Sequence, residues 1–508
     1  MKPIRYFGLA AIPLLGGLHP GFSADREKDP QRPNILFVLS DDHTSQSWGI
    51  YGGILAEYVR NDNISKLAEE GCVLDNCFCT NSISSPSRAS LLTGSYSHIH
   101  GLYTLSDSFP PGTDHIVKQL GKAGYQTALF GKWHLKTRPE GFDYYSVFYE
   151  QGEYVDPTFI STGDPWPENR NYGERMKGFS TDIVTRKAIK WMKEADRNNP
   201  FIICCHFKAT HEPWDFPERM RHIYDGVIFP EPDNLQDWNR DNGRTFDGQP
   251  LEILADRWAR CSKDPDEWWC RYPELPFSLE GKERRQARSE AYQKFIRDYL
   301  RCGATIDDNI GRLLRALDEM GVADNTIVVY MSDQGYFLGE HGFFDKRMMY
   351  EESLRMPCVI RYPKEIPAGS RNKDIILNID FASLLADYAG VEPPALSQGN
   401  SFRQNLRGKT PENWRKDMYY RYWTHHHNRP AHLGIRTERY KLMYLYGDPL
   451  TMTGSESKPT EPSWEFYDLM KDPSENHNVY DNKEYRNVIE VLKERLAILA
   501  ESYCDKMP

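Results

Sequence analysis

Pro33-Asn-Ile-Leu-Phe-Val-Leu-Ser40 is a continuous apolar run that ends abruptly in Asp41-Asp42. A second run of the same type, Asn325-Thr-Ile-Val-Val-Tyr-Met-Ser332, ends in Asp333-Gln334. Continuous apolar strands are typical of a parallel sheet that helices cover on both faces. Such sheets bind ligands at the carboxyl ends of their strands, and both polar pairs fall there. The two runs therefore predict an α/β fold with a polar site at one edge of the sheet.

Segments with apolar residues at helical spacing alternate with these strands. They lie at 64–70, 116–123, 180–197 and 289–320. Because alternating strands and helices indicate a doubly wound architecture, we predict a large, mixed, mostly parallel sheet sandwiched by helices. We assign this α/β domain to residues 25–394. Within it, 215–282 is predicted to be a loop-rich insertion, rich in Trp, Pro, Arg and Asp, beside the polar site.

The character of the sequence changes after about Pro394. Short strands are predicted at 418–423, 433–437, 439–446 and 464–469, and an amphipathic helix is predicted at 485–503. We therefore expect residues 395–508 to form a smaller C-terminal α+β subdomain with an antiparallel sheet.

The first residues have the features of a cleavable signal peptide, which we assign to 1–24. Lys2 and Arg5 precede an apolar stretch at 6–18, and small residues follow it before the charged run at 25–28. This stretch is too short to span a bilayer, and no later one is long and apolar enough. We expect a periplasmic or secreted protein without a membrane span. The net charge of −10 argues against a nucleic-acid partner.

The most informative segment is Ser84-Ser-Pro-Ser-Arg88-Ala-Ser-Leu-Leu-Thr-Gly94. A Ser before a Pro in the first turn begins many helices, so the first residues alone are unspecific. The whole string, however, resembles the sulfatase signature, which reads Cys or Ser-x-Pro-Ser-Arg followed by x-x-x-Leu-Thr-Gly. The resemblance extends from Pro33 to the end of the chain. It implies the formylglycine-dependent (type I) sulfatases of the alkaline phosphatase superfamily.

The resemblance implies that a maturation enzyme oxidises Ser84 to formylglycine (3-oxoalanine). A plain serine that attacked sulfur would leave a stable sulfate ester on the enzyme. A hydrated aldehyde has two hydroxyls, one to attack sulfur and one to expel sulfate, which splits a hard hydrolysis into two easier steps. Ser rather than Cys at this position resembles the bacterial sulfatases that mature without oxygen.

The residues after the two strands offer oxygen ligands to a metal. Asp41, Asp42, Asp333 and Gln334 carry carboxylate and amide oxygens, which favour calcium or magnesium over zinc. Acidic residues also cap turns, so neither pair alone is decisive. The sulfatase pattern has metal ligands at these places and at Ser84, and it implies Ca²⁺ ahead of Mg²⁺. Asn is common in the family where Gln334 stands.

Three further elements match the family in order. They are Gly131-Lys132-Trp-His134, Lys208-Ala-Thr-His211-Glu-Pro-Trp and Asp345-Lys346-Arg-Met-Met-Tyr-Glu-Glu-Ser-Leu-Arg-Met-Pro357. By resemblance, Arg88 and Lys132 orient the nucleophile and neutralise charge. The resemblance also assigns His134 as the base during sulfate release, and places His211, as general acid, with Lys346 at the ester oxygen.

Two later histidines, His425 and His432, are candidate substrate contacts. The run His425-His426-His427 could instead bind a metal, but the oxygen site already accounts for one cation.

Together, the motifs and the resemblance predict hydrolysis of a sulfate ester on a sulfated glycan such as a glycosaminoglycan fragment. The partners would be the sulfated carbohydrate and the enzyme that matures Ser84. Two alternatives stay open. Phosphonate monoester and phosphodiester hydrolases of the same superfamily share the signature, and a glycan-binding relative with an unconverted Ser84 would lack catalysis.

Overall fold

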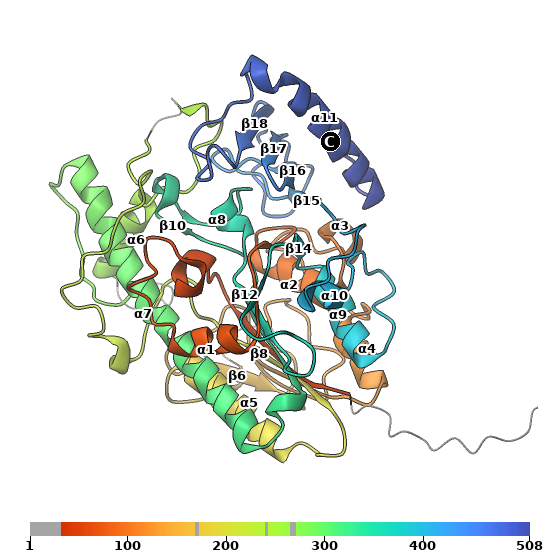
Figure 1. Ribbon diagram of the computed structural model, residues 1–508. Helices are drawn as coiled ribbons and strands as arrows, with labels where there is room; N and C mark the ends of the chain where they lie inside the picture. Colours follow the sequence, from red (N-terminus) through yellow and green to blue (C-terminus); the bar gives the residue numbers. More distant parts are fainter. Residues whose placement is uncertain (1–31, 168–171, 239–241, 265–270) are drawn as a thin grey trace, which may run out of the picture. The chain divides into compact units, whose positions relative to one another are not determined.

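A mixed sheet of ten strands organises the computed structural model (Figure 1). The structure describes residues 32–167, 172–238, 242–264 and 271–508. The predicted signal peptide lies outside these ranges and stays a prediction. The order of the strands is β13 (Ser370–Asn372), β2 (Cys72–Leu74), β12 (Cys358–Arg361), β9 (Thr326–Ser332), β1 (Asn34–Ser40), β8 (Phe201–His206), β4 (Gln126–Lys132), β5 (Tyr144–Phe148), β6 (Thr158–Ser161) and β7 (Glu174–Arg175).

The centre of the sheet is parallel, as predicted. Strands β9, β1, β8, β4 and β5 run in one direction, whereas β12 lies antiparallel between β9 and β2. The two strands predicted from the acidic endings are therefore immediate neighbours. Their register aligns Ser40 with Ser332, so Asp41 and Asp333 leave the sheet side by side.

Helices cover both faces of the sheet, and β1 is therefore buried on both sides. Ile35, Phe37 and Leu39 enter one apolar core, and Leu36 and Val38 enter the other. This alternation follows from the two-residue period of a strand. The first core contains side chains of α2 (Ser84–Thr93), α4 (Ile116–Lys122) and α9 (Asp380–Ala389). The second contains side chains of α1 (Asp62–Glu70), α5 (Ser180–Glu194) and α7 (Arg284–Glu319) (Figure 1).

The C-terminal part forms the predicted antiparallel sheet of four strands. These are β15 (Asp417–Tyr422), β16 (His432–Thr437), β17 (Tyr440–Leu445) and β18 (Ser463–Asp468), and α11 (Arg486–Ser502) packs against them. An ion-pair cluster around the half-buried Glu351 connects this sheet to the segment after β9. Glu351 lies 3.0 Å from Arg436 and 3.1 Å from Lys441.

The predicted insertion at 215–282 contains a helix that the sequence pattern did not predict. This helix is α6 (Glu252–Lys263), and it packs against α7. Leu254, Trp258 and Cys261 are its buried side chains, four and three residues apart, which is the spacing of one helical face. The remaining short elements are β3 (Cys77–Phe78), β10 (Phe337–Leu338), β11 (Phe344–Asp345), β14 (Ile376–Leu377), α3 (Ser97–His100), α8 (Glu351–Leu354) and α10 (Arg403–Leu406).

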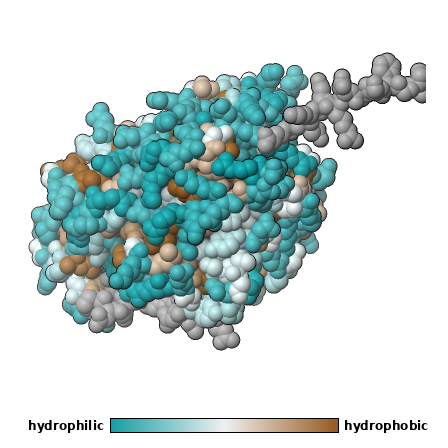
Figure 2. All heavy atoms as spheres, turned by 90° about the horizontal axis from the view of Figure 1, so that it is seen from below, coloured by the Kyte–Doolittle hydropathy of each residue, from teal (hydrophilic) through white to brown (hydrophobic). Residues whose placement is uncertain are grey.

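No described helix combines the length and apolarity needed to cross a membrane. Hydrophilic side chains cover most of the face drawn in Figure 2, and apolar side chains occur there in small separate groups. Scattered apolar groups of this kind are normal for a folded protein surface.

Candidate active site

The predicted oxygen ligands converge at the carboxyl ends of β1 and β9. One oxygen from each of Asp41, Asp42 and Asp333 lies within 4.8 Å of the others, and all three residues are buried. Ser84 reaches this cluster from the start of α2, and its Oγ donates to Asp41 Oδ1 over 3.2 Å. Gln334 Nε2 lies 3.3 Å from the same Oγ. The structure thus brings together all five residues predicted as metal ligands.

The first turn of α2 places the nucleophile position and its arginine on one side of the helix. Ile83 is the N-cap residue, and no side chain caps the helix, so Ser84 Oγ is not used for capping. Arg88 follows one turn later, a spacing that aligns two side chains. Its Nε donates to Asp333 Oδ2 over 3.0 Å, and its Nη1 donates to the Lys132 carbonyl over 3.0 Å. The helix start also directs partial positive charge at this point.

The cluster fits a divalent cation bound by hard oxygen ligands. Gln334 Oε1 is buried and has no hydrogen-bond partner within the described residues. Burial raises the pKa of Asp42, and it raises the pKa of Asp333 to about 7. Burial acts in the same direction on Asp41, but Lys132 and neighbouring cations hold the pKa of that carboxyl well below its usual range. Neighbouring carboxylates and an unused amide oxygen are the donor set that calcium or magnesium takes.

Two lysines from different parts of the chain donate hydrogen bonds to the carboxylates of the cluster. Lys132, at the end of β4, donates from Nζ to Asp41 and, over 2.6 Å, to Gln151 Oε1. Lys346 Nζ lies 2.5 Å from Asp42 Oδ2. Burial lowers the pKa of Lys132 to about 8, whereas the carboxylates around Lys346 outweigh burial and raise its pKa. Lys346 therefore stays positively charged at neutral pH.

The two predicted catalytic histidines flank this cluster. His211 Nε2 lies 3.7 Å from Asp42 Oδ2, and its Nδ1 lies 2.8 Å from the Glu212 carbonyl. His134 Nε2 lies 3.1 Å from Gln151 Nε2. Burial, followed by the positive charge of Lys132, holds the pKa of both rings well below the usual range. Both histidines are therefore neutral in the absence of other ligands, so each can accept a proton.

The two predicted substrate contacts belong to the C-terminal part of the chain, where His432 is the first residue of β16 and His425 precedes it. His425 and His432 are fully buried. His425 Nε2 lies 3.1 Å from the Lys458 carbonyl, and His432 Nδ1 lies 2.8 Å from the Pro430 carbonyl. The His432 ring also stacks on Tyr420. These contacts are typical of histidines that stabilise the fold by packing and hydrogen bonding. Contact of either ring with the substrate stays a prediction.

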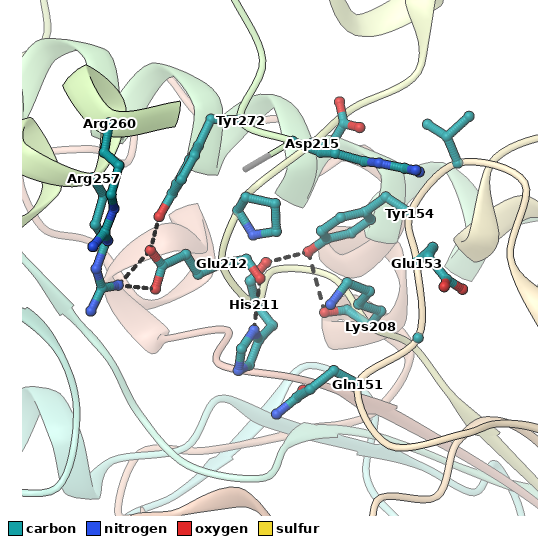
Figure 3. Close-up of a pocket in the computed structure, with 14 residues that line it drawn as sticks. Gln151, Glu153, Tyr154, Lys208, His211, Glu212, Asp215, Arg257, Arg260 and Tyr272 are labelled. Atoms are coloured by element: carbon teal, nitrogen blue, oxygen red, sulfur yellow. Dashed lines mark hydrogen bonds and ion pairs between the residues drawn. The ribbon is translucent and has the colours of Figure 1, made fainter. Parts of the chain in front are cut away.

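Sequence reasoning missed several residues that line the site. A cavity of about 90 Å³ adjoins Ser84 and is also lined by Gln151, Glu212 and Arg257. Glu212 accepts two hydrogen bonds of 2.6 Å from Arg257 and one from Tyr272, as Figure 3 shows. Neither Gln151 nor Arg257 belongs to a motif that the sequence reveals. The helical face of α6 was the one signal that could have pointed to Arg257.

Comparison with known proteins agrees with this geometry. A profile described as sulfatase matches residues 33–391, well over half of the chain. The chain belongs to the sulfatase family. A second profile, described as N-sulphoglucosamine sulphohydrolase, C-terminal, matches residues 339–502. The predicted family and the predicted enzyme class, a sulfuric ester hydrolase, are confirmed.

Individual relatives cover nearly the whole of this sulfatase. An N-acetylglucosamine-6-O-sulfatase of Bacteroides thetaiotaomicron is 39% identical over 98% of this chain and 91% of its own length. An arylsulfatase of Clostridium perfringens is 24% identical over 92% of this chain and 94% of its own length.

Solved structures extend the comparison to three dimensions. One in complex with its substrate, D-glucosamine-2-N,6-O-disulfate, superimposes with a TM-score of 0.84 at 38% identity, covering 94% of this chain and 99% of the other. A phosphonate monoester hydrolase of Agrobacterium radiobacter has a TM-score of 0.70 at 22% identity, covering 93% and 96%. At that identity the likeness shows a shared fold alone.

Proposed function

We propose that this sulfatase hydrolyses the 6-O-sulfate ester of a glucosamine unit derived from a glycosaminoglycan, with formylglycine at position 84 and Ca²⁺ in the oxygen cluster. The observation that carries the proposal is the position of Ser84 Oγ. It lies 3.2 Å from Asp41, within a ring of carboxylates that buried cations surround. Identity of 39% with an N-acetylglucosamine-6-O-sulfatase over nearly the whole chain supports the choice of sugar.

The oxygen cluster would hold the metal through Asp41, Asp42, Asp333 and Gln334. When bound, Ca²⁺ supplies a template and a Lewis acid for the sulfate group. Once oxidised, residue 84 supplies a hydrated aldehyde with one hydroxyl for attack on sulfur and one for later expulsion of sulfate.

Cationic side chains neutralise the charge that develops on the sulfate oxygens. Lys346 remains protonated beside Asp42, and Lys132 and Arg88 hold the nucleophile position from the other side. Fixed charges of this kind need no rearrangement during the reaction, and each commonly contributes a factor of about 100 or more in rate.

Two histidines move the protons. The sugar oxygen that leaves as an alkoxide takes a proton from His211 Nε2, the ring nitrogen directed toward the reaction site. His211 acquires that proton when the negatively charged ester binds beside it, because an adjacent anion raises a histidine pKa. In the second half-reaction, His134 accepts the proton of the remaining hydroxyl as the C–O bond to sulfate breaks.

The test is sulfate release from a panel of defined saccharides by matured protein with calcium. The panel contains glucosamine units sulfated at one position each, and the control is Ser84→Ala. Release from 6-O-sulfated glucosamine alone is expected, and the peptide with residue 84 should have lost two hydrogens. Release from another position would reject the proposed specificity. Hydrolysis of a phosphonate monoester with no sulfate release would reject the reaction.

A further inference from the structure

A second and larger cavity opens beside the reaction site. Its volume is about 360 Å³, which is within the range of small-molecule sites. It shares Gln151, His211, Glu212 and Arg257 with the cavity at Ser84. We call it the side cavity, and its remaining wall includes Tyr154, Lys208, Asp215, Arg260, Arg271 and Tyr272 (Figure 3).

Lys208 is the unusual member of this wall. The residue is 4% exposed, and its Nζ lies 4.9 Å from the centre of the Tyr154 ring. Throughout the described ranges, that Nζ has no hydrogen-bond acceptor and no carboxylate within ion-pair distance. A buried ammonium without a carboxylate at ion-pair distance costs free energy. Burial accordingly lowers the pKa of Lys208, and the more distant charges of Asp41, Glu153 and Asp42 offset this effect only in part. The assigned roles of the site residues leave Lys208 unused.

The carboxylates of the side cavity are held by other groups. Glu212 is bound by Arg257 and Tyr272. Asp215 accepts from the Phe216 amide over 2.8 Å. Glu153 accepts from the Thr158 amide over 3.4 Å. The hydrogen bonds given for these acids thus go to groups other than Lys208, and Glu153 acts on Lys208 only from beyond ion-pair distance.

Cations exceed anions in the side cavity, although the whole chain carries a net charge of −10. Its wall contains four cationic residues, Lys208, Arg257, Arg260 and Arg271, and three acidic residues, Glu153, Glu212 and Asp215. One positive charge remains even when all three acids are ionised. The rings of Tyr154 and Tyr272 add aromatic surface of the kind on which sugar rings pack.

We infer that the side cavity is a second anion subsite, in which Lys208 binds an oxyanion of the saccharide while the sulfate ester occupies the site at Ser84. Arg260 and Arg271, both on the exposed wall, assist it. The ligand group is a sulfamate on the same sugar or a carboxylate on the neighbouring sugar. This inference rests on the proposed function, because it requires a saccharide substrate.

The test compares Lys208→Met with Lys190→Met. Lys190 is the matched control because its side chain is 75% exposed on α5. Three substrates carry the same 6-O-sulfate: an N-acetylated sugar, an N-sulfated sugar, and an N-acetylated sugar linked to a uronic acid. Wild-type protein should prefer one of the two charged substrates, and which one is preferred identifies the source of the anion.

In Lys208→Met, the ratio of kcat/KM for the preferred charged substrate to kcat/KM for the neutral one should fall about 30-fold. That factor corresponds to about 2 kcal/mol, the usual value of a hydrogen bond to a charged group. Lys190→Met should leave the ratio unchanged. An equal loss on charged and neutral substrates, or no loss on either, would overturn the inference. Because a buried substitution can unfold a protein, the exposed Arg271→Gln is measured as well, with an expected fall of about 3-fold.

A binding measurement separates this inference from the proposed reaction. Ser84→Ala is titrated calorimetrically with N-sulfoglucosamine, and with a uronic acid disaccharide, neither of which carries a sulfate ester. Binding that Lys208→Met weakens about 30-fold would support the subsite even if wild-type protein released no sulfate. Binding of neither compound, or binding that Lys208→Met does not change, would reject it.

Discussion

Replacement of Gln334 by Met tests the metal site most directly. The two side chains have similar lengths, so Gln334→Met removes the amide oxygen with little change in volume. Gln334 Oε1 is buried without a hydrogen-bond partner in the part of the chain that the structure describes, and we propose that it binds Ca²⁺. The variant also loses the Nε2 donor to Asp42. Removal of the unpaired oxygen offsets that loss, so the metal-free protein should stay within about 1 kcal/mol of wild type.

The affinity for calcium should fall by much more. Loss of one buried polar contact to a charged group costs about 2 kcal/mol, which raises Kd about 30-fold. At a calcium concentration of 100 times the wild-type Kd, bound metal stabilises the native state by about 2.7 kcal/mol. With a 30-fold weaker Kd the same concentration would stabilise Gln334→Met by about 0.9 kcal/mol.

Isothermal titration of metal-stripped protein with calcium at pH 8 measures the two Kd values. The control is Gln398→Met, because Gln398 accepts from the Tyr96 amide outside the oxygen cluster. Binding should weaken at pH 6, since burial raises the pKa of Asp333 to about 7 and its proton must leave before metal binds. An unchanged Kd in Gln334→Met, or equal weakening in Gln398→Met, would refute the assignment of Gln334 as a ligand.

Three further substitutions test other parts of the site. Ser84→Ala should abolish sulfate release while the melting temperature stays within a few degrees of wild type; retained turnover would reject the role of residue 84. Lys346→Met should lower kcat by a factor of about 100, measured beside the exposed control Lys364→Met, and a loss under fivefold would reject its role. Burial raises the pKa of Asp215 from 3.8 to about 6, so ionisation of this acid costs stability as the pH rises through that interval. Asp215→Asn should therefore raise the free energy of unfolding by at most about 3 kcal/mol at pH 8 and change it little at pH 3, and an equal difference at both pH values in urea unfolding would contradict this reading.

Much of the fold could be predicted because its signals are local. The parallel core strands ending at Ser40 and Ser332 were predicted from their unbroken apolar runs, and the observed ends agree. The four C-terminal strands also lie where alternation and turns predicted them. In contrast, α6 was missed because Trp, Pro and Arg around it obscure the spacing of Leu254 and Trp258. Strands of two or three residues, such as β2 and β3, carry too few side chains for any pattern.

The site likewise contains residues that could be predicted from the sequence and residues that could not. The motif around Ser84 and Arg88 is contiguous, so its resemblance to the sulfatase signature could be recognised, and the chemistry that this resemblance implies could be stated, before any contact was known. Gln151 and Arg257 reach the site from a loop and from the insertion, and no spacing in the sequence connects them to Ser84. Lys208 was visible in a motif. That no carboxylate of the described residues lies within ion-pair distance of it depends on how the surrounding segments fold.

The sequence by itself determined which chemical groups this sulfatase has: a serine in a sulfatase signature, oxygen ligands after two apolar strands, and lysines and histidines in family order. The oxygen ligands follow from residue type and from their place after the strands, whereas the signature and the family order follow from resemblance to the sulfatases. Only the tertiary structure decided the register of β1 against β9, which pairs Ser40 with Ser332 and so places Asp41 beside Asp333 across 292 positions of sequence. It also decided which groups are neutral, because burial and neighbouring charge set the pKa values of His134 and His211. Both depend on long-range packing, which local patterns do not encode.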